Sequence, residues 1–524
     1  MATRNDALNS PRSERNAPRA ADAPGGLNAS SFDRALFVAL SVVVGLAAVA
    51  PRTVDLGLRA LWLDECSTWH VARLPLLDSF RWPPEITIPP LYQLCVRALF
   101  ADKEPMSEWM LRLPAAVAGV ALVPVVWWLG HRCGGRWVGL AVAALVALHP
   151  LSIEYSREAR PYSLLQLFGT LASVLWLELL RRPRAALLVA YVTGMMLALY
   201  SHVLAVPLLA AHASLLVTKG VRAHRVIFVR GWGAIGACLI TMIPLALRVI
   251  LNKSALNEAL SWNPALTPTT AWSILSAAGF GAVWSTLLIG SVVVTIWLVL
   301  RARRGASTMP AWVRSVRAFE QRALILLVLW VLLSIGALVA AAMLGMPLVA
   351  KRYLLAATPA ILLLPLLVLR RAHRFAPLAA ALCFVAPGLP DSIGPPITEP
   401  GLRELMRYIR TNESSSATVL TAVSAHSESF RELEMLGAKY YAPQFDLWVN
   451  PLMLSDELEA LGSLDFDGRI YLIVMLGDPL PLITKAGRTI EPVPMEDTFV
   501  TQLLYPPYRL IALAPKAAES KPPP

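Results

Sequence analysis

The sequence predicts a polytopic α-helical membrane protein with about eleven transmembrane helices, a long first external loop and a small C-terminal α/β domain. Of its 524 residues, 56% are hydrophobic and only 16% are charged, whereas soluble globular proteins carry about 25% charged residues. Apolar runs of roughly 17–22 residues recur, each long enough to cross a hydrocarbon core about 30 Å thick. The net charge is +12, but the arginines gather in short loops between these runs. That distribution is typical of the positive-inside bias of membrane proteins and argues against nucleic-acid binding.

The N-terminal region sets the orientation. Residues 1–32 are rich in Ala, Asn, Pro, Ser and Arg without apolar periodicity, so we expect a disordered cytoplasmic tail. The apolar run at about 35–51 begins too far into the chain for a cleaved signal peptide, and we interpret it as a retained first span. With the basic tail inside, residues 52–112 form the first external loop. Within this loop, Ile88–Phe100 is too short to span and suits a helix lying at the membrane interface.

The other spans complete a membrane domain over residues 33–392, with basic clusters at their cytoplasmic ends. The second, third, seventh, eighth and eleventh are expected at about 113–130, 137–150, 231–250, 283–300 and 375–389. The fourth returns to Arg181, the fifth exits at Tyr200–His202, the sixth returns to Lys219, the ninth exits near Gly345, and the tenth runs from Lys351 to Arg370. Residues 265–300 leave room for a further segment.

After Pro387 the composition changes. Residues 393–524 carry acids, turn residues and two short β-like runs at 417–423 and 469–475, with helix-like stretches at 402–409 and 427–436. This alternation predicts a small α/β domain, which the topology places outside the membrane.

The five cysteines show neither a CxxC pair nor a Cys/His spacing typical of zinc sites. For Cys66 and Cys95, two unrelated thiols are favoured over a disulfide.

Two adjacent acids, Asp64 and Glu65, lie between Trp62 and Trp69 where the first span leaves the bilayer. Ionised acids in such surroundings cost free energy, so they usually have a partner or a task. We expect the rest of the chain to bring a substrate to this pair.

A second polar segment lies between the third and fourth spans. If the stretch from Ser152 is helical, Glu154, Arg157 and Glu158 share one face, with Arg160 and Tyr162 near the turn at Pro161. One interpretation is a salt-bridge cluster that closes a helix hairpin. The other is a site for an anionic substrate that also includes Tyr155, because a guanidinium fork matches phosphate oxygens and stays charged near a membrane.

Two further polar groups are expected at external helix ends. His202 follows the fifth span, where a lone histidine is more often a hydrogen-bonded interfacial residue than a catalyst. Lys351, Arg352 and Tyr353 open the tenth span. The two cations either anchor the helix end by snorkelling or have a function, since basic residues on the outer side run against the charge bias.

A helix bundle can collect these polar groups into one cavity at the outer leaflet. Cations would stabilise the negative charge on a departing phosphate, while a carboxylate takes the proton of an attacking hydroxyl and balances an oxocarbenium-like centre. A lipid-phosphate donor carries its own activation, which agrees with the absence of a P-loop or GxGxxG pattern from the sequence.

With these residues the sequence resembles the GT-C class of membrane glycosyltransferases. Within that class it is similar to the family of dolichyl-phosphate-mannose protein mannosyltransferases and bacterial lipid A aminoarabinose transferases (glycosyltransferase family 39-like). No single motif is specific, but the ordered set is. The segments that carry the resemblance, over about residues 35–370, are Leu63–Glu65, Pro89–Tyr92 with Leu111–Pro114, Tyr155–Tyr162, and Arg352–Leu355 before a helix that contains Pro359.

The resemblance implies transfer of a hexose or pentose from a polyprenyl-phosphate donor to a hydroxyl acceptor, with inversion, on the periplasmic or lumenal side. Asp64 would be the catalytic base and Glu65 a neighbouring acid that orients donor or acceptor. Arg160 and Arg352 would bind phosphate, and the family's second-loop acid falls on either Glu154 or Glu158. The acceptor, whether a glycan, a lipid or a protein, stays open.

We therefore expect a multi-pass inner-membrane enzyme with a cytoplasmic N-terminus and a periplasmic C-terminal domain. No obligatory metal is expected, although Asp64 and Glu65 are oxygen ligands of a kind that a divalent cation accepts. One alternative is a transporter or flippase of a lipid-linked glycan, which predicts mid-membrane ionisable groups and inverted repeats. The other is a non-catalytic scaffold whose C-terminal domain binds a partner.

Overall fold

The computed structural model describes residues 29–79, 90–100, 103, 106–222, 224–251, 264–303, 318–346, 348–393, 418–422, 440, 470–474, 490–491 and 509–513. Residues 1–43 and 44–524 form two compact units. The described part of the first unit is the N-terminal portion of helix α1 (Ala29–Thr53). The predicted disordered tail therefore lies outside the described residues, except for its last four, which begin α1.

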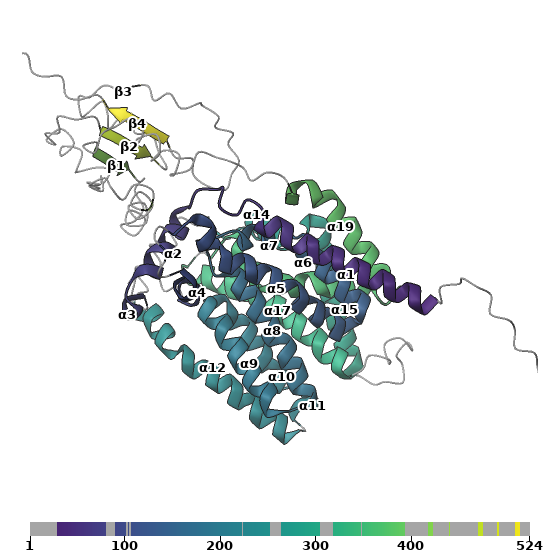
Figure 1. Cartoon of the computed structure of the whole chain (residues 1–524). Helices are drawn as coiled ribbons and strands as arrows, with labels where there is room; N and C mark the ends of the chain where they lie inside the picture. Colours follow the sequence, from purple (N-terminus) through teal and green to yellow (C-terminus); the bar gives the residue numbers. More distant parts are fainter. Residues whose placement is uncertain are drawn as a thin grey trace, which may run out of the picture. The chain divides into compact units, whose positions relative to one another are not determined.

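The second unit is built mainly of α-helices (Figure 1). Its long or central helices are α5 (Glu108–Gly134), α6 (Arg136–Ala147), α7 (Pro150–Ser156), α8 (Tyr162–Arg181), α9 (Ala185–Ser201), α10 (Val206–Leu216), α12 (Arg225–Leu251), α14 (Pro268–Ala278), α15 (Gly281–Arg303), α17 (Ala318–Met343), α18 (Thr358–Leu369) and α19 (Ala376–Ile393). Short pieces join them: the 3₁₀ turns η1 (Val203–Ala205) and η3 (Lys351–Ala357), and α11 (Lys219–Arg222).

Each of the eleven predicted spans coincides with a helix, but the predicted count is not confirmed. Among the residues that the structure describes, seven helices are long and apolar enough to cross a membrane, or eight if the bent pair of α6 and α7 is one span. The helices at the other predicted spans, α9, α10 and α19, are apolar but shorter. The chain is thus a multi-pass membrane protein that also contains several shorter apolar helices.

The core lies where α5, α6, α8, α9, α10, α17 and α18 meet. These helices are apolar on nearly every side, as expected for helices surrounded by protein and lipid. Gly130 in α5 and Gly139 in α6 let their backbones approach closely, since a Cβ on Gly130 would lie 2.9 Å from the Gly139 Cα. Small residues at such crossings are the usual device for packing helices in membranes.

The break between α6 and α7 positions the polar residues that follow it. The two helices bend by 59° ahead of Pro150, whose ring disfavours helical geometry in the preceding residue. Arg52 is fully buried there and donates to the Val146 and Ala147 carbonyls at 2.9 and 2.6 Å. It thereby satisfies carbonyl groups that the end of α6 leaves without helical partners. The His149 ring accepts the Ser152 N–H at 3.2 Å and caps the N-terminus of α7.

The first external loop folds into three helices, α2 (Leu63–Arg73), α3 (Leu76–Ser79) and α4 (Leu91–Phe100). The helix predicted within residues 88–100 is confirmed as α4, which packs between α2 and α5 around a small second core. Cys66 and Cys95 are free thiols, as the sequence predicted.

The described C-terminal residues form a four-stranded sheet. Its strands are β1 (Thr418–Ala422), β2 (Ile470–Val474), β3 (Ile490–Glu491) and β4 (Arg509–Leu513), in the order β1-β2-β4-β3. β1 and β2 are parallel, and β4 is antiparallel to both of its neighbours. The two predicted strands are therefore present. The two predicted helices, at 402–409 and 427–436, lie outside the described residues, so the α/β domain stays a prediction.

Candidate active site

A buried ion pair locks the first loop onto the bundle. Arg112, near the start of α5, donates Nε and Nη2 to the two carboxylate oxygens of Glu65 at 2.8 and 2.7 Å. The side chains of the pair are 1% and 0% exposed. Arg112 also donates to the backbone carbonyls of Leu56, Arg59 and Ala60. Such a forked guanidinium–carboxylate contact fixes orientation as well as distance.

Glu65 has further partners that occupy its carboxylate. Its oxygens accept the Ala159 N–H at 2.8 Å and the Trp62 N–H at 3.3 Å. Burial opposes ionisation of Glu65, but the Arg112 charge and these hydrogen bonds hold its pKa below the usual value. The expected role of Glu65, orienting a substrate, is thus less suited to its geometry than a structural one, because four N–H donors already surround it.

The turn at residues 157–161 is clamped against α2 from both sides. Glu65 accepts the Ala159 N–H, and Thr68 donates its hydroxyl to the Ala159 carbonyl at 2.8 Å. Both backbone polar groups of a fully buried alanine are therefore satisfied by two side chains of α2. This clamp brings the next residue, Arg160, to the first turn of α2.

Asp64 and Arg160 form the second ion pair. The Arg160 Nη2 lies 3.4 Å from the Asp64 Oδ2, and Nη1 donates to the Asp64 carbonyl at 3.2 Å. The Asp64 side chain is 24% exposed, against 7% for Arg160. Arg160 Nε is buried without a hydrogen-bond partner among the described residues. Burial lowers the pKa of Arg160, yet the carboxylate of Asp64 more than offsets this, so that pKa lies above its ordinary value.

Aromatic and basic side chains surround this pair. The Tyr162 ring lies 5.3 Å from the His202 ring and 5.0 Å from the Tyr155 ring, between centroids. The guanidinium of Arg352 in η3 lies 5.4 Å from the ring of Tyr353 and interacts electrostatically with Asp64 and Tyr162. We refer to Asp64, Arg160, Tyr162, His202 and Arg352 as the Asp64 cluster.

His202 is neutral in this cluster. Burial and the nearby positive charges of Arg160 and Arg352 lower its pKa to about 3. Its Nδ1 accepts the Leu204 N–H at 3.2 Å, so the ring carries its proton on Nε2. A neutral imidazole with a fixed tautomer is a hydrogen-bond donor at Nε2 and not a proton acceptor there.

The other predicted site residues are divided between different partners. Glu154 in α7 pairs with Lys351 in η3 at 2.8 Å, next to the cluster. Arg157 donates to the Pro51 and Val54 carbonyls at 2.7 and 2.8 Å and so caps the end of α1. Glu158 is fully buried, with Arg59 at 3.6 Å.

The predicted helical face of Glu154, Arg157 and Glu158 is therefore wrong. The helix ends at Ser156, so residue 157 is already outside it. Arg157 points away from Glu154 and Glu158 because it donates hydrogen bonds to carbonyl groups that the end of α1 leaves without helical partners.

Metal binding by Asp64 together with Glu65 is not favoured by this geometry, because the Glu65 carboxylate is engaged by Arg112. Within the described ranges there is no group of three or more His, Cys, Asp or Glu side chains suited to a metal ion. The expectation that no metal is obligatory stays a prediction.

Sequence reasoning gave no role to several residues that build the site. Arg112 was noticed only as part of a motif, although an arginine at the start of an apolar span is itself a signal of a buried partner. Tyr92, in another motif, donates to the Leu111 carbonyl at 2.7 Å and holds α4 on α5. Gln166 donates to the Leu355 carbonyl at 3.1 Å and ties α8 to η3. The sequence carries no local signal for Thr68 or Gln166.

Residues 89–248 match the family model described as dolichyl-phosphate-mannose-protein mannosyltransferase. No curated protein matches the sequence. Among solved structures, the chain is similar to ArnT from Cupriavidus metallidurans bound to undecaprenyl phosphate, at 14% identity over 92% of this chain and 98% of that one, with a TM-score of 0.49.

It is also similar to the oligosaccharyltransferase of Archaeoglobus fulgidus tethered with an acceptor peptide containing the NVT sequon. The identity is 12%, over 85% of this chain and 69% of that one, with a TM-score of 0.50. At an identity this low, the similarity to the oligosaccharyltransferase shows a shared fold. The matched family model and this fold confirm the resemblance to the GT-C class of membrane glycosyltransferases that the sequence predicts.

Proposed function

We propose that this protein transfers a monosaccharide from a polyprenyl-phosphate donor to an acceptor hydroxyl at the Asp64 cluster. The observation that carries the proposal is the partly exposed Asp64 carboxylate, which pairs with the buried guanidinium of Arg160 and interacts electrostatically with the half-buried guanidinium of Arg352. The family model and the fold support the enzyme class. ArnT, a structural relative, was solved with undecaprenyl phosphate, which agrees with a lipid-phosphate donor.

In the proposed reaction, the acceptor oxygen bonds to the anomeric carbon of the sugar while the bond from that carbon to the phosphate oxygen breaks. Asp64 takes the proton of the acceptor hydroxyl. Arg160 and Arg352 hold the phosphate, which leaves with the bonding electron pair as polyprenyl phosphate. Attack opposite to the leaving group gives inversion at the anomeric carbon.

The resting geometry suits an exchange of partners at Arg160. Its contact with Asp64, at 3.4 Å, is longer than the 2.7 Å contact between Arg112 and Glu65. Arg160 Nε, buried without a partner among the described residues, is a donor for a phosphate oxygen. A phosphate that binds Arg160 would loosen its hold on Asp64 and leave that carboxylate available as a base.

The remaining predicted residues are given supporting roles. Tyr155, Tyr162 and His202 supply flat ring faces with polar edges, which suit a sugar ring. Glu154 and Lys351 tie α7 to η3 and so hold Arg352 and Tyr353 in position. We propose that Glu65 acts through Asp64, by fixing the first turn of α2.

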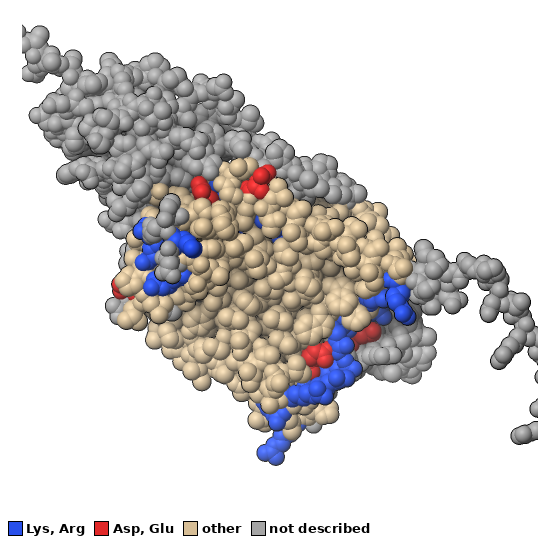
Figure 2. Space-filling view, viewed as in Figure 1, with Lys and Arg blue, Asp and Glu red and all other residues tan. Residues whose placement is uncertain are grey.

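We further propose that the Asp64 cluster faces the periplasm of an inner membrane. Lysine and arginine side chains form a band over one end of the described helices, at the lower right of Figure 2. Helix α8 ends at Arg181, and Arg182 and Arg184 follow it before α9 begins, so this end of α8 is basic. The positive-inside bias assigns such an end to the cytoplasm. The Asp64 cluster lies at the opposite ends of the same helices, since Tyr162 opens α8.

The test is a turnover assay in detergent with radiolabelled polyprenyl-phosphate sugars, both hexoses and pentoses, and a mixture of glycan, lipid and peptide acceptors. Wild type should release free polyprenyl phosphate, and Asp64→Asn should release at least about 100-fold less, which is the usual contribution of a general base. Full activity of folded Asp64→Asn would remove Asp64 from the mechanism. Donor binding and transbilayer movement without cleavage would favour a transporter or flippase instead.

A further inference from the structure

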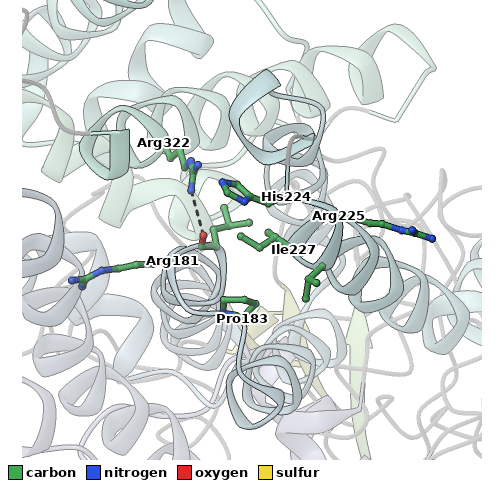
Figure 3. A pocket seen from close by; sticks show the side chains of 8 residues that line it. Arg181, Pro183, His224, Arg225, Ile227 and Arg322 are labelled. Carbon is green, nitrogen blue, oxygen red and sulfur yellow. Dashed lines mark hydrogen bonds between the residues drawn. The ribbon is translucent and has the colours of Figure 1, made fainter.

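A pocket of about 560 Å³ lies at the end of the bundle away from the Asp64 cluster. Helix α8 separates the two sites, since Tyr162 is its first residue and Arg181 its last. The helix has 20 residues and is therefore about 30 Å long. The pocket lies between the end of α8, the start of α12 and the start of α17 (Figure 3). It is therefore a separate site that the proposed transfer reaction does not use.

The charge of this pocket favours an anion. Four of its described lining residues are basic or titratable, namely Arg181, His224, Arg225 and Arg322, and none of the eight is acidic. Arg322 and His224 face one another across the pocket, while Arg181 and Arg225 extend outward on either side (Figure 3). Helix α12 begins at Arg225, so the positive end of its macrodipole also lies at the rim.

A neighbouring pocket of about 520 Å³ shares Arg181 and is also lined by Arg132, Arg182, Arg184 and Glu178. In that pocket, Arg132 is paired with Glu178, so part of its positive charge is already neutralised. The pocket with Arg322 has no such carboxylate among its described lining residues. With His224 neutral, the described lining residues carry a formal charge of +3 in both pockets, so charge alone does not separate the two.

The surface beside the pocket indicates where the anion comes from. Val226 at the pocket, followed by Val229 and Trp232 along α12, are 54%, 58% and 39% exposed. Their spacing of three residues places them on one face of the helix. Because α12 is a candidate membrane span, this exposed apolar stripe lies where acyl chains are available. A lipid with an anionic headgroup matches both surfaces at once.

We propose that this pocket binds the phosphate headgroup of an anionic phospholipid, with Arg322 and His224 as the phosphate donors and the acyl chains along Val226, Val229 and Trp232. Bound lipid would join α8, α12 and α17 at this end of the bundle. A ligand that binds only the folded protein stabilises it in proportion to the logarithm of its concentration. The lipid is therefore expected to raise the thermal unfolding temperature.

The experiment uses the full chain in a neutral detergent, titrated with dioctanoyl phosphatidylglycerol, dioctanoyl phosphatidylcholine or inorganic phosphate. Binding is followed by the unfolding temperature and by native mass spectrometry. Phosphatidylglycerol should bind and raise the unfolding temperature, and the other two should not. Equal binding of phosphatidylcholine would refute the need for an anion. Equal effects of inorganic phosphate would show that the site takes a soluble anion and refute the lipid.

Two variants and one control locate the site. Arg322→Gln should weaken phosphatidylglycerol binding by at least about fivefold, the contribution of one arginine near an anionic lipid. His224→Gln should weaken it as well, because it removes the imidazole that lies beside Arg322 in the pocket. Arg374→Gln is the control. It removes an exposed arginine after α18 that does not line the pocket, and it should leave the affinity for phosphatidylglycerol unchanged. Arg322 also donates to the Leu180 carbonyl at 3.3 Å, so Arg322→Gln could disturb the fold as well as the site. His224 has an exposed side chain, and His224→Gln therefore tests the site even if Arg322→Gln fails to fold. Wild-type affinity in both folded variants would overturn the proposal.

Discussion

Adjacent acids in α2 should respond in opposite ways to the loss of their charge. Asp64→Asn should abolish transfer and leave the fold stable, whereas Glu65→Gln should destabilise the fold. The reason is their different surroundings. Glu65 is 0% exposed against the guanidinium of Arg112, while Asp64 is 24% exposed and 3.4 Å from Arg160.

The size of the difference follows from these contacts. Removing one partner of a buried ion pair leaves an uncompensated buried charge and costs about 3–5 kcal/mol. Glu65→Gln leaves Arg112 in this state and also places an amide NH₂ against its donors. In the second pair the Asp64 carboxylate is 24% exposed but the Arg160 side chain is only 7% exposed. Asp64→Asn should therefore cost about 1–2 kcal/mol, between the values for exposed and for buried pairs, and the two variants should differ by at least about 1 kcal/mol.

Both variants can be measured by denaturant titration in detergent micelles, with transfer activity measured separately and normalised to the folded fraction. Folded Glu65→Gln should keep most of its activity, and folded Asp64→Asn should keep almost none. The double variant Glu65→Gln with Arg112→Gln tests the coupling, since the two losses should be far from additive. Equal stability of the two single variants, or a stable but inactive Glu65→Gln, would contradict the structural role of Glu65.

Gly119 in α5 leaves no room for a side chain, because a Cβ there would lie 2.5 Å from the Ser156 Cβ. Gly119→Ala should therefore lower the free energy of unfolding by about 1–3 kcal/mol. As a control, Gly233→Ala should not lower it, because no atom lies within 4 Å of a Cβ at that position. His202 has a pKa of about 3 in the fold against an ordinary value of 6.5, so it binds fewer protons than in the unfolded chain, and its contribution to stability is present above pH 6.5 and is lost as the pH falls towards 3. His202→Gln should flatten that part of the curve of unfolding temperature against pH, and an unchanged slope would argue against a neutral imidazole at this half-buried position. Arg160→Lys keeps the charge but loses the fork, so the KM for the lipid donor should rise by about tenfold with a smaller change in kcat, and an unchanged KM would exclude Arg160 as a phosphate ligand.

Many of the helices can be predicted from the sequence. The predicted spans coincide with helices, and α4 was expected within residues 88–100. Hydrophobic length and the placement of arginines are local properties, so they are readable without a fold. The number of full spans could not be predicted as well, because α9, α10 and α19 are apolar helices that are shorter than a membrane crossing requires. Composition alone does not separate such helices from full spans.

The residues of the site were predicted, but the partner of each side chain was not. Asp64, Arg160, His202 and Arg352 do come together, as their positions at the same ends of different helices suggested. Arg157 was expected among them, but it caps α1 instead. The sequence does not show which unsatisfied backbone carbonyls lie within reach of a side chain 103 residues away.

The sequence by itself determined that this is a membrane protein with acids in its first loop and cations at distant helix ends. Only the tertiary structure decided which of the two adjacent acids is locked in place and which stays partly open. Successive side chains on an α-helix point about 100° apart. In the first turn of α2, that rotation directs Glu65 into the core, onto Arg112, and Asp64 towards Arg160 at the more exposed side.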